Sequence, residues 1–285
     1  MVPKLFFSLL IALGASFTSF SQVVTTADDI SKAELIMGKM VENQSRSSSD
    51  LMAIGGLLML DTPYVAGTLD NGDKEQLTIY TTKTDCILMV ETVFNMVQSV
   101  RQAGAGADFK RFSENVRMSR YRDGIVEHYS DRIHYTTEWI RQKEARGLVK
   151  DLTMDIGGIT YYHPISYMSR HISQYPQLAS AATDPEAALN LSVIKAVENV
   201  LNYESLCYIP KADIYSIEPM IKSGDIICII SDTPGLDIAH VGMAFWRSDG
   251  KLGFLHASMK AGKVVIDEET LAQYPKIGIK VIRVL

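Results

Sequence analysis

Apolar residues recur at helical spacing between residues 28 and 60, and a polar segment at residues 44–50 divides them into two groups. The apolar positions are Ile30, Leu35, Ile36, Met40, Leu51, Ile54, Leu57 and Leu58. Asp50 ends the polar segment, where its carboxylate can accept a free N–H group of a first helical turn. The pattern therefore predicts two helices, with Asp50 as the cap of the second.

Residues 87–100 also follow helical spacing, with apolar side chains at positions 87, 90, 93, 94, 97 and 100. Thr84 or Asp85 is expected to cap the start of this helix, and Gly104 to stop it. Cys86 then lies in the first turn, where unpaired N–H groups and the helix dipole stabilise a thiolate and lower its pKa. The alternative is a small buried residue at a helix start, because free cysteines are usually buried.

Arginines are interleaved with aromatic residues between positions 107 and 205, where helical patterns occur near 107–119, 136–146 and 184–203. Arginine with aromatic side chains suits a polar, partly anionic ligand, through bidentate contacts and ring stacking. Ordinary solvated helices have the same composition, so both interpretations stay open. The residues are Arg111, Arg117, Arg120, Arg122, Arg132, Arg141, Arg146, Arg170, Tyr121, Tyr129, Tyr135, Trp139, Tyr161, Tyr162 and Tyr167.

From residue 225 onward the pattern is that of strands separated by turn residues. A short helix is expected near residues 268–274. The chain therefore reads as α+β, with helices first and an antiparallel sheet afterwards. The strand candidates are residues 225–230, 238–246, 252–258, 263–266 and 277–285.

Two histidines fall on adjacent strands of this predicted sheet. If the turn at residues 248–250 closes a hairpin, His240 and His256 are diagonal neighbours on one face. The small Gly242 and Ala244 on that face would leave room for the helix that starts at Cys86. A thiol beside two imidazoles is the layout of a cysteine hydrolase, with Cys86 as nucleophile, His240 as general base and acid, and His256 as orienting group.

Two other interpretations of the histidines stay open. Buried polar groups usually serve structure, and a histidine on a strand is often only hydrogen-bonded there. A metal site with one cysteine and two histidines is the second alternative, but zinc sites usually have closer ligand pairs and a fourth donor, and the sequence has no such motif. The prediction is therefore a site without metal or cofactor.

The first residues are typical of a secretory signal peptide, with Lys4, the apolar run of residues 5–13 and small or polar residues up to Ser21. This run is shorter than the ~20 apolar residues of a membrane span. We expect residues 1–21 to be removed and 22–285 to form one exported domain without a transmembrane span. A Gram-negative periplasm is the expected location, although an exported Gram-positive protein would carry similar signals. The formal charge of −5, without a basic stripe, argues against a nucleic-acid partner.

The three cysteines leave the disulfide pairing open. An oxidising compartment would permit Cys207 and Cys228 to pair, but free buried thiols fit equally well, because the sequence has no short disulfide framework.

Five ordered blocks resemble the NlpC-type papain-like cysteine hydrolases of bacterial cell walls. This resemblance implies a papain-like fold, and it implies that Tyr64 helps to polarise the substrate carbonyl. The usual Asp-Cys-Ser-Gly block reads Asp-Cys-Ile-Leu here, which favours a branch other than the common endopeptidases. The blocks are residues 62–67, 84–86, 223–227, 239–243 and 255–258.

Four further blocks, at residues 120–124, 134–139, 167–171 and 235–238, resemble the N-acetylmuramoyl-L-alanine amidase-like family. The resemblance implies cleavage of the amide between muramic acid and L-alanine in peptidoglycan fragments, with preference for anhydro-muramyl peptides. It implies a mostly helical insertion at about residues 107–205 that walls the substrate groove. Besides the Cys86, His240 and His256 trio, the candidate oxyanion and substrate-binding residues are Tyr64, Asp85, Arg120, Tyr121, Tyr167 and Arg170.

Two other functions stay open at this point. An endopeptidase that cuts D-glutamyl to diamino-acid bonds of the stem peptide would use the same trio. A non-catalytic muropeptide-binding protein would keep the fold without thiol chemistry. Neither the oligomeric state nor the exact bond follows from the sequence.

Overall fold

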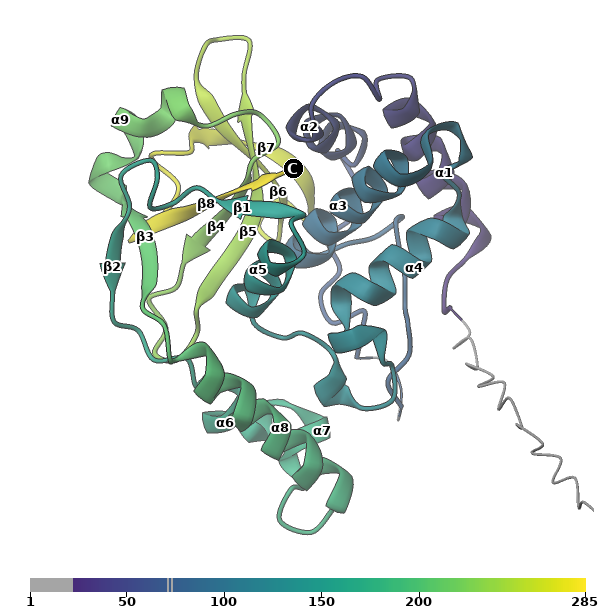
Figure 1. Cartoon of the computed structure of the whole chain (residues 1–285), viewed down its shortest axis with the longest axis vertical. Coiled ribbons are helices and arrows are strands. Elements are labelled where there is room, and N and C mark those ends of the chain that lie inside the picture. The colour runs from purple at the N-terminus through teal and green to yellow at the C-terminus, as the bar shows by residue number, and fades with distance from the viewer. Residues whose placement is uncertain (1–22, 71, 73) are drawn as a thin grey trace, which may run out of the picture.

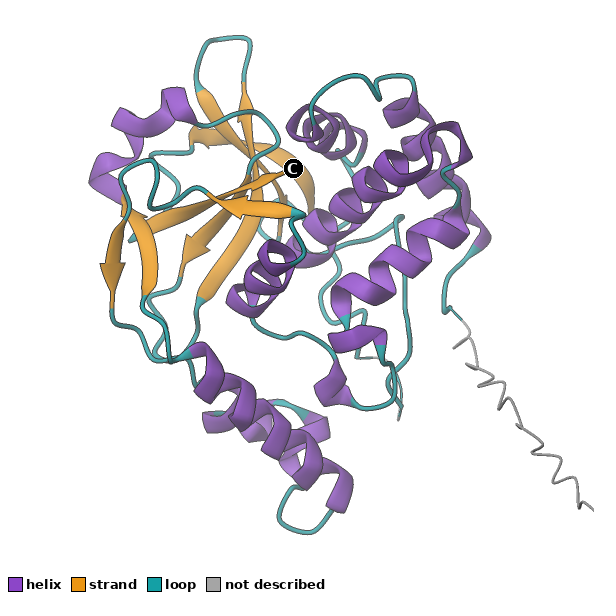
Figure 2. Cartoon of the chain, viewed as in Figure 1, coloured by secondary structure: helices purple, strands orange, loops and turns teal. Residues whose placement is uncertain are grey.

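The computed structural model describes residues 23–285 except 71 and 73. The predicted signal peptide, residues 1–21, lies outside the described residues. Within them no helix has the length and apolar character needed to cross a membrane. Helices gather on one side and strands on the other, as the α+β prediction requires (Figure 1, Figure 2).

Five helices of the first half lie against the sheet or against one another (Figure 1). The second predicted cap was misplaced by one turn. Ser47 caps that helix and Asp50 returns the bond from the third position, so the two form a capping box. The helices are α1 Ala27–Val41, α2 Ser48–Leu58, α3 Cys86–Ala103, α4 Phe109–Arg120 and α5 Thr136–Ala145.

The described residues form an eight-stranded antiparallel sheet in the order β2-β3-β8-β4-β5-β6-β7, with β1 paired to β8. The long strands come from the C-terminal third, as predicted. The strands are β1 Val149–Asp151, β2 Ile159–Tyr161, β3 Leu206–Pro210, β4 Ile226–Ile230, β5 Ile238–Trp246, β6 Leu252–Ser258, β7 Lys263–Thr270 and β8 Gly278–Val284.

The hairpin of β5 and β6 has the predicted register, with Trp246 opposite Leu252 and Met243 opposite Leu255. The predicted face for the helix is wrong. Met243 and Leu255 lie so close to Gly56 of α2 that a Cβ there would meet both at 2.7 Å. Since side chains alternate along a strand, Ala244 lies on the opposite face, in a second apolar cluster.

Gly242 serves that second face rather than the helix. A Cβ at this position would lie 2.6 Å from Cε2 of Phe254 and 2.7 Å from Cβ of His256. Glycine is therefore what allows the Phe254 ring and His256 to approach β5.

The region predicted as a mostly helical insertion is more varied. Besides α4 and α5 it contributes β1 and β2 to the sheet, and it ends in a separate helical cluster that projects from the body (Figure 1). This cluster holds α6 Tyr167–Arg170, α7 Pro176–Ala179 and α8 Pro185–Leu201. A further short helix, α9 Ile214–Ile217, precedes β4.

The predicted helix at residues 268–274 is absent from the described chain, because β6 takes the backbone groups that it would need. Thr270 pairs with Gly253, and the N–H of Leu271 donates to the carbonyl of Leu252. The chain turns only afterwards. All three cysteines are described, and each is a free thiol.

Candidate active site

Cys86 is the first residue of α3, and Asp85 caps the helix by accepting the N–H of Leu88 at 2.9 Å. The backbone N–H of Val241 on β5 lies near the sulfur of Cys86 and acts to lower the pKa of the thiol. β5 pairs with β6 from Met243 to Trp246. The thiol therefore contacts the sheet at the end of β5 beyond this pairing, next to His240.

The predicted lowering of the thiol pKa is wrong for the free protein. Burial, followed by the negative charge of Asp85, raises the pKa of Cys86 to about 11, against the effect of the N–H groups of Val241 and of the helix start. The free energy lost by removing a charged sulfur from water is larger than the free energy that these N–H groups contribute by hydrogen bonding. Near neutral pH the thiol of the free protein therefore holds its proton.

His240 and His256 meet on the sheet as predicted. Nε2 of His240 lies 2.7 Å from Nδ1 of His256, and the two rings are nearly perpendicular at 89°. Nε2 of His256 lies 3.3 Å from Oδ2 of Asp267 on β7. Three adjacent strands thus carry a diagonal row of polar side chains.

Both imidazoles are neutral near pH 7. Burial, followed by the neighbouring His256, lowers the pKa of His240 to about 4. Burial also lowers the pKa of His256, although the Asp267 carboxylate opposes it. A neutral imidazole has one free lone pair, which a general base needs.

Two aromatic rings hold the imidazoles in place. Phe254 stacks on His256 with a centroid distance of 4.6 Å and an interplanar angle of 17°. Tyr274 lies over His240 at 6.1 Å and edge-on to His256 at 5.3 Å. The charge on Cys86 contributes to raising the pKa of Tyr274, after burial and Asp267, so Tyr274 lies near the thiol as well.

Sequence reasoning missed Asp267 and Tyr274. The strand prediction ended at residue 266, and Tyr274 was placed in a helix. Alternation was the available signal for Asp267, because it lies two positions beyond Val265, the partner of His256 on β7.

Tyr64 lies near Cys86. Its segment runs parallel to the residues before α3, with a bridge between Tyr64 and Thr84, and its N–H donates to Gly262. Burial, then the charges of Cys86 and Asp85, raises the pKa of the Tyr64 hydroxyl. This hydroxyl therefore stays protonated and able to donate.

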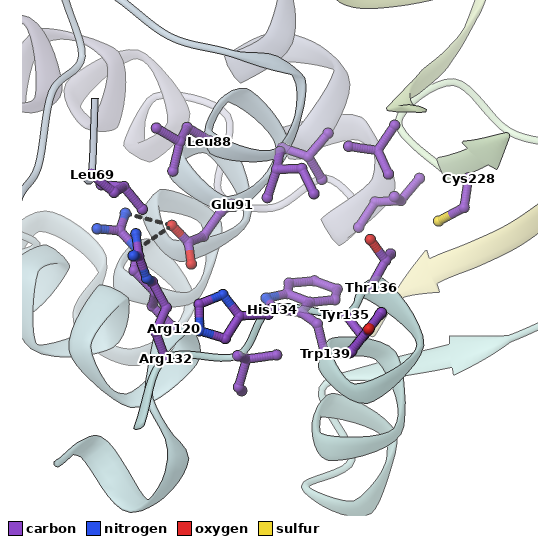
Figure 3. Close-up of a pocket in the computed structure, with 15 residues that line it drawn as sticks. Leu69, Leu88, Glu91, Arg120, Arg132, His134, Tyr135, Thr136, Trp139 and Cys228 are labelled. Carbon is purple, nitrogen blue, oxygen red and sulfur yellow. Dashed lines mark hydrogen bonds and ion pairs between the residues drawn. The ribbon is translucent and has the colours of Figure 1, made fainter. Parts of the chain in front are cut away.

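Arg120 and Tyr121 have their polar groups occupied inside the protein. Arg120 is 5% exposed and forms a buried ion pair with Glu91, with 2.9 Å between Nε and the carboxylate (Figure 3). The Tyr121 hydroxyl donates to Glu75 at 2.7 Å. These contacts tie α4 to α3 and to the segment before α3.

Tyr167 and Arg170 lie on α6 in the projecting cluster. The Tyr167 ring stacks on His171 at 4.2 Å, and its hydroxyl donates to Gln174 at 3.1 Å. The backbone N–H of Tyr167 donates to Gly235, three residues before β5 begins. The structure thus joins α6 to the loop that leads to His240 through this backbone hydrogen bond, and the Tyr167 side chain contacts residues of its own cluster.

A mostly apolar cavity of about 80 Å³ lies between α3, α5 and the sheet (Figure 3). Its lining includes Ile87 and Val241, the neighbours of Cys86 and His240, and reaches the ion pair of Glu91 and Arg120. Among the described residues no group of three or more His, Cys, Asp or Glu side chains is arranged to hold a metal ion.

A family model and solved structures of amidases identify the family of this chain. A model described as AmiA-like, N-acetylmuramoyl-L-alanine amidase-like, matches residues 55–278. An N-acetylmuramoyl-L-alanine amidase from Bacteroides uniformis is 36% identical, with 84% of this chain and 99% of that chain covered and a TM-score of 0.75. No curated protein matches the chain.

Two other solved structures share the fold. A protein from Bacteroides fragilis, described as a candidate xylanase, is also 36% identical, with 80% of this chain and 99% of that chain covered and a TM-score of 0.72. A protein from Legionella pneumophila is 24% identical, with 90% and 94% covered and a TM-score of 0.66, and it shows the fold alone.

Proposed function

Because this chain belongs to the N-acetylmuramoyl-L-alanine amidase-like family, we propose that it is a cysteine amidase of papain-like, NlpC-type fold. Its substrate is a peptidoglycan fragment, and the bond it cleaves joins the lactyl group of (anhydro-)N-acetylmuramic acid to L-alanine. The observation that carries this proposal is the meeting of Cys86, at the start of α3, with the backbone beside His240, whose imidazole is bonded to His256.

The reaction begins when His240 takes the thiol proton and the sulfur of Cys86 attacks the lactyl carbonyl carbon. The carbon–nitrogen bond then breaks, His240 returns the proton to the leaving amine of L-alanine, and a thioester remains. Water attacks the thioester with His240 as base, which releases the sugar acid and restores the thiol. A neutral imidazole and a neutral thiol suit this order, because proton transfer accompanies attack.

The negative oxygen of each tetrahedral intermediate needs hydrogen-bond donors. Backbone N–H groups at the start of α3 and the hydroxyl of Tyr64 are our candidates, with Asp85 ordering the first turn. A donor of this kind typically contributes ~3 kcal/mol to the transition state.

The helical part of the chain between Cys86 and His240 is proposed to wall the substrate groove. Tyr167 and Arg170 are the proposed contacts from α6, since that helix is bonded to the loop before β5. Arg120 and Tyr121 support α3 from within rather than touch substrate, because their polar groups are already bonded. The place of action is outside the cytoplasm, in the periplasm if residues 1–21 direct export.

The deciding experiment is mass spectrometry of a defined anhydro-disaccharide tetrapeptide after incubation with the protein lacking residues 1–21. We expect release of the intact tetrapeptide and the free sugar. Cys86→Ala should abolish turnover while Cys207→Ala, which removes another half-buried thiol, retains it. A cut inside the peptide would show an endopeptidase instead, and unchanged activity in Cys86→Ala would exclude the thioester mechanism.

A further inference from the structure

The row of polar side chains on β5, β6 and β7 runs from His240 through His256 to Asp267. His256 pairs with Val265 on β7, so Asp267 lies diagonally from it on the same face. The pairing of β6 with β7 shifts between Gly253 and Leu255, and Asp267 is the first residue of that irregular stretch. Irregularities of this kind commonly re-aim a side chain. Here the carboxylate comes within 3.3 Å of Nε2 of His256.

The hydrogen bonds along the row determine where each proton lies. A carboxylate only accepts, so the Nε2 of His256 must carry a proton to donate to Asp267. The Nδ1 of neutral His256 then carries no proton and accepts a hydrogen bond. The donor is the N–H at Nε2 of His240, which lies 2.7 Å away. A neutral His240 with its proton on Nε2 has a free, basic Nδ1.

We propose that Asp267 is a positioning residue that fixes the tautomer of His256 and, through it, leaves Nδ1 of His240 as the basic nitrogen for Cys86. This inference rests on the proposed function for its catalytic consequence, but not for the tautomers themselves. Phe254 and Tyr274 assist, because rings stacked on the imidazoles prevent the flips that would exchange their nitrogens.

The carboxylate also matters once His240 has taken the proton. The imidazolium charge is then shared with His256 through the 2.7 Å bond, and Asp267 is the negative group at the end of the row. The Tyr274 ring packs against both imidazoles, and burial, followed by the charges of Asp267, Cys86 and Glu269, raises the pKa of its hydroxyl. This hydroxyl stays protonated near neutral pH, whereas the Asp267 carboxylate raises the pKa of His256 against the effect of burial, so its charge stabilises the imidazolium.

The test is Asp267→Asn, which keeps the shape of the side chain and removes its charge. Glu268→Gln is the matched control, because Glu268 is the next residue of β7, carries the same charge and is exposed. Two-bond correlations between ring hydrogens and nitrogens in ¹⁵N-histidine protein read the tautomers directly. In the wild type we expect protonated Nε2 on both histidines, and in Asp267→Asn a change at His256.

The kinetic readout is the pH profile on the muropeptide substrate. Asp267→Asn should lower kcat by about 10- to 1000-fold, less than the roughly 10⁴-fold of an Asp→Asn change that acts on the catalytic histidine directly. Its acid limb should move to lower pH, because loss of the carboxylate lowers the pKa of the imidazolium. Glu268→Gln should change neither.

The outcomes separate the two proposals. A proton on Nδ1 of His256 in the wild type would overturn the inference whatever the enzyme cleaves, and so would an Asp267→Asn variant with native tautomers, kcat and pH profile. If the tautomers behave as expected but the tetrapeptide is not released, the proposed amidase fails and the positioning role of Asp267 stands.

Discussion

Nε2 of His240 and Nδ1 of His256 lie 2.7 Å apart although the two residues are separated by a hairpin turn. The register of β5 and β6 makes them diagonal neighbours, and Gly242, between them on that face, lets His256 approach β5. The pair therefore depends on strand pairing and on the missing side chain at Gly242.

The activity should have a broad pH plateau. Burial lowers the pKa of His240 to about 4, so its imidazole is a free base above pH 4. The pKa of Cys86 is raised to about 11, so its thiol keeps a proton to give below pH 11. We expect kcat/KM to fall as the pH drops through about 4 and to stay level across neutral pH. An acid limb near the ordinary histidine value would contradict the neutral, buried pair.

The free thiol should react slowly with iodoacetamide at neutral pH. Because alkylation requires the thiolate, its rate at Cys86 should rise with pH up to about 11. Mass spectrometry of the modified peptide would measure this rate, with the half-buried Cys207 in the same protein as an internal comparison. Fast alkylation of Cys86 at neutral pH would show a preformed thiolate and contradict the proposed order of proton transfer.

Gly242→Ala should disrupt the histidine pair. The new methyl group would lie under 3.0 Å from Phe254 and His256, so at least one of these side chains must move. Overpacking of this kind typically costs 1–3 kcal/mol of unfolding free energy, and we expect kcat to fall as well. Urea unfolding and kinetics would measure both effects.

The matched control is Gly38→Ala on α1, where a Cβ meets nothing within 4 Å. It should leave kcat unchanged and keep or raise stability, because alanine is the better helix former by about 1 kcal/mol. Equal effects of the two substitutions would show that the crowding at Gly242 is unimportant.

Arg120→Met should destabilise the protein rather than alter substrate binding. It leaves the Glu91 carboxylate buried without its cation, and breaking a buried pair in this way typically costs 3–5 kcal/mol. Removing both charges, with Glu91→Met in addition, should recover most of that loss. Chemical unfolding of the single and double variants tests this, and a raised KM with native stability would instead support the substrate contact predicted from the sequence.

Tyr64→Phe should lower kcat by roughly 10²-fold, the typical effect of losing one oxyanion donor. KM should change little, because the bond to the oxygen strengthens only as negative charge develops. Tyr80→Phe, a hydroxyl on the segment that leads to α3, is the control and should retain wild-type kcat. A large rise in KM with normal kcat would place Tyr64 in ground-state binding.

Much of the architecture followed from local patterns. Helical spacing located α1 to α3, alternation located the strands after residue 225, and the turn at residues 248–250 set the register of β5 with β6. The family was also recognisable from short blocks around Cys86, His240 and His256. These features are set by the pattern of residues close together in the chain, which can be read without knowledge of distant contacts.

The tertiary structure decided the rest, because burial and non-local charge depend on what packs around a residue. It reversed the expected shift of the Cys86 pKa, since the desolvation of the sulfur and the Asp85 charge outweigh the helix N-terminus. It placed the polar groups of Arg120 and Tyr121 in hydrogen bonds to Glu91 and Glu75 inside the protein, rather than on the wall of a substrate groove. The alternation of residues predicted that His240 and His256 would meet, whereas only the fold brought Asp267 to the end of their row.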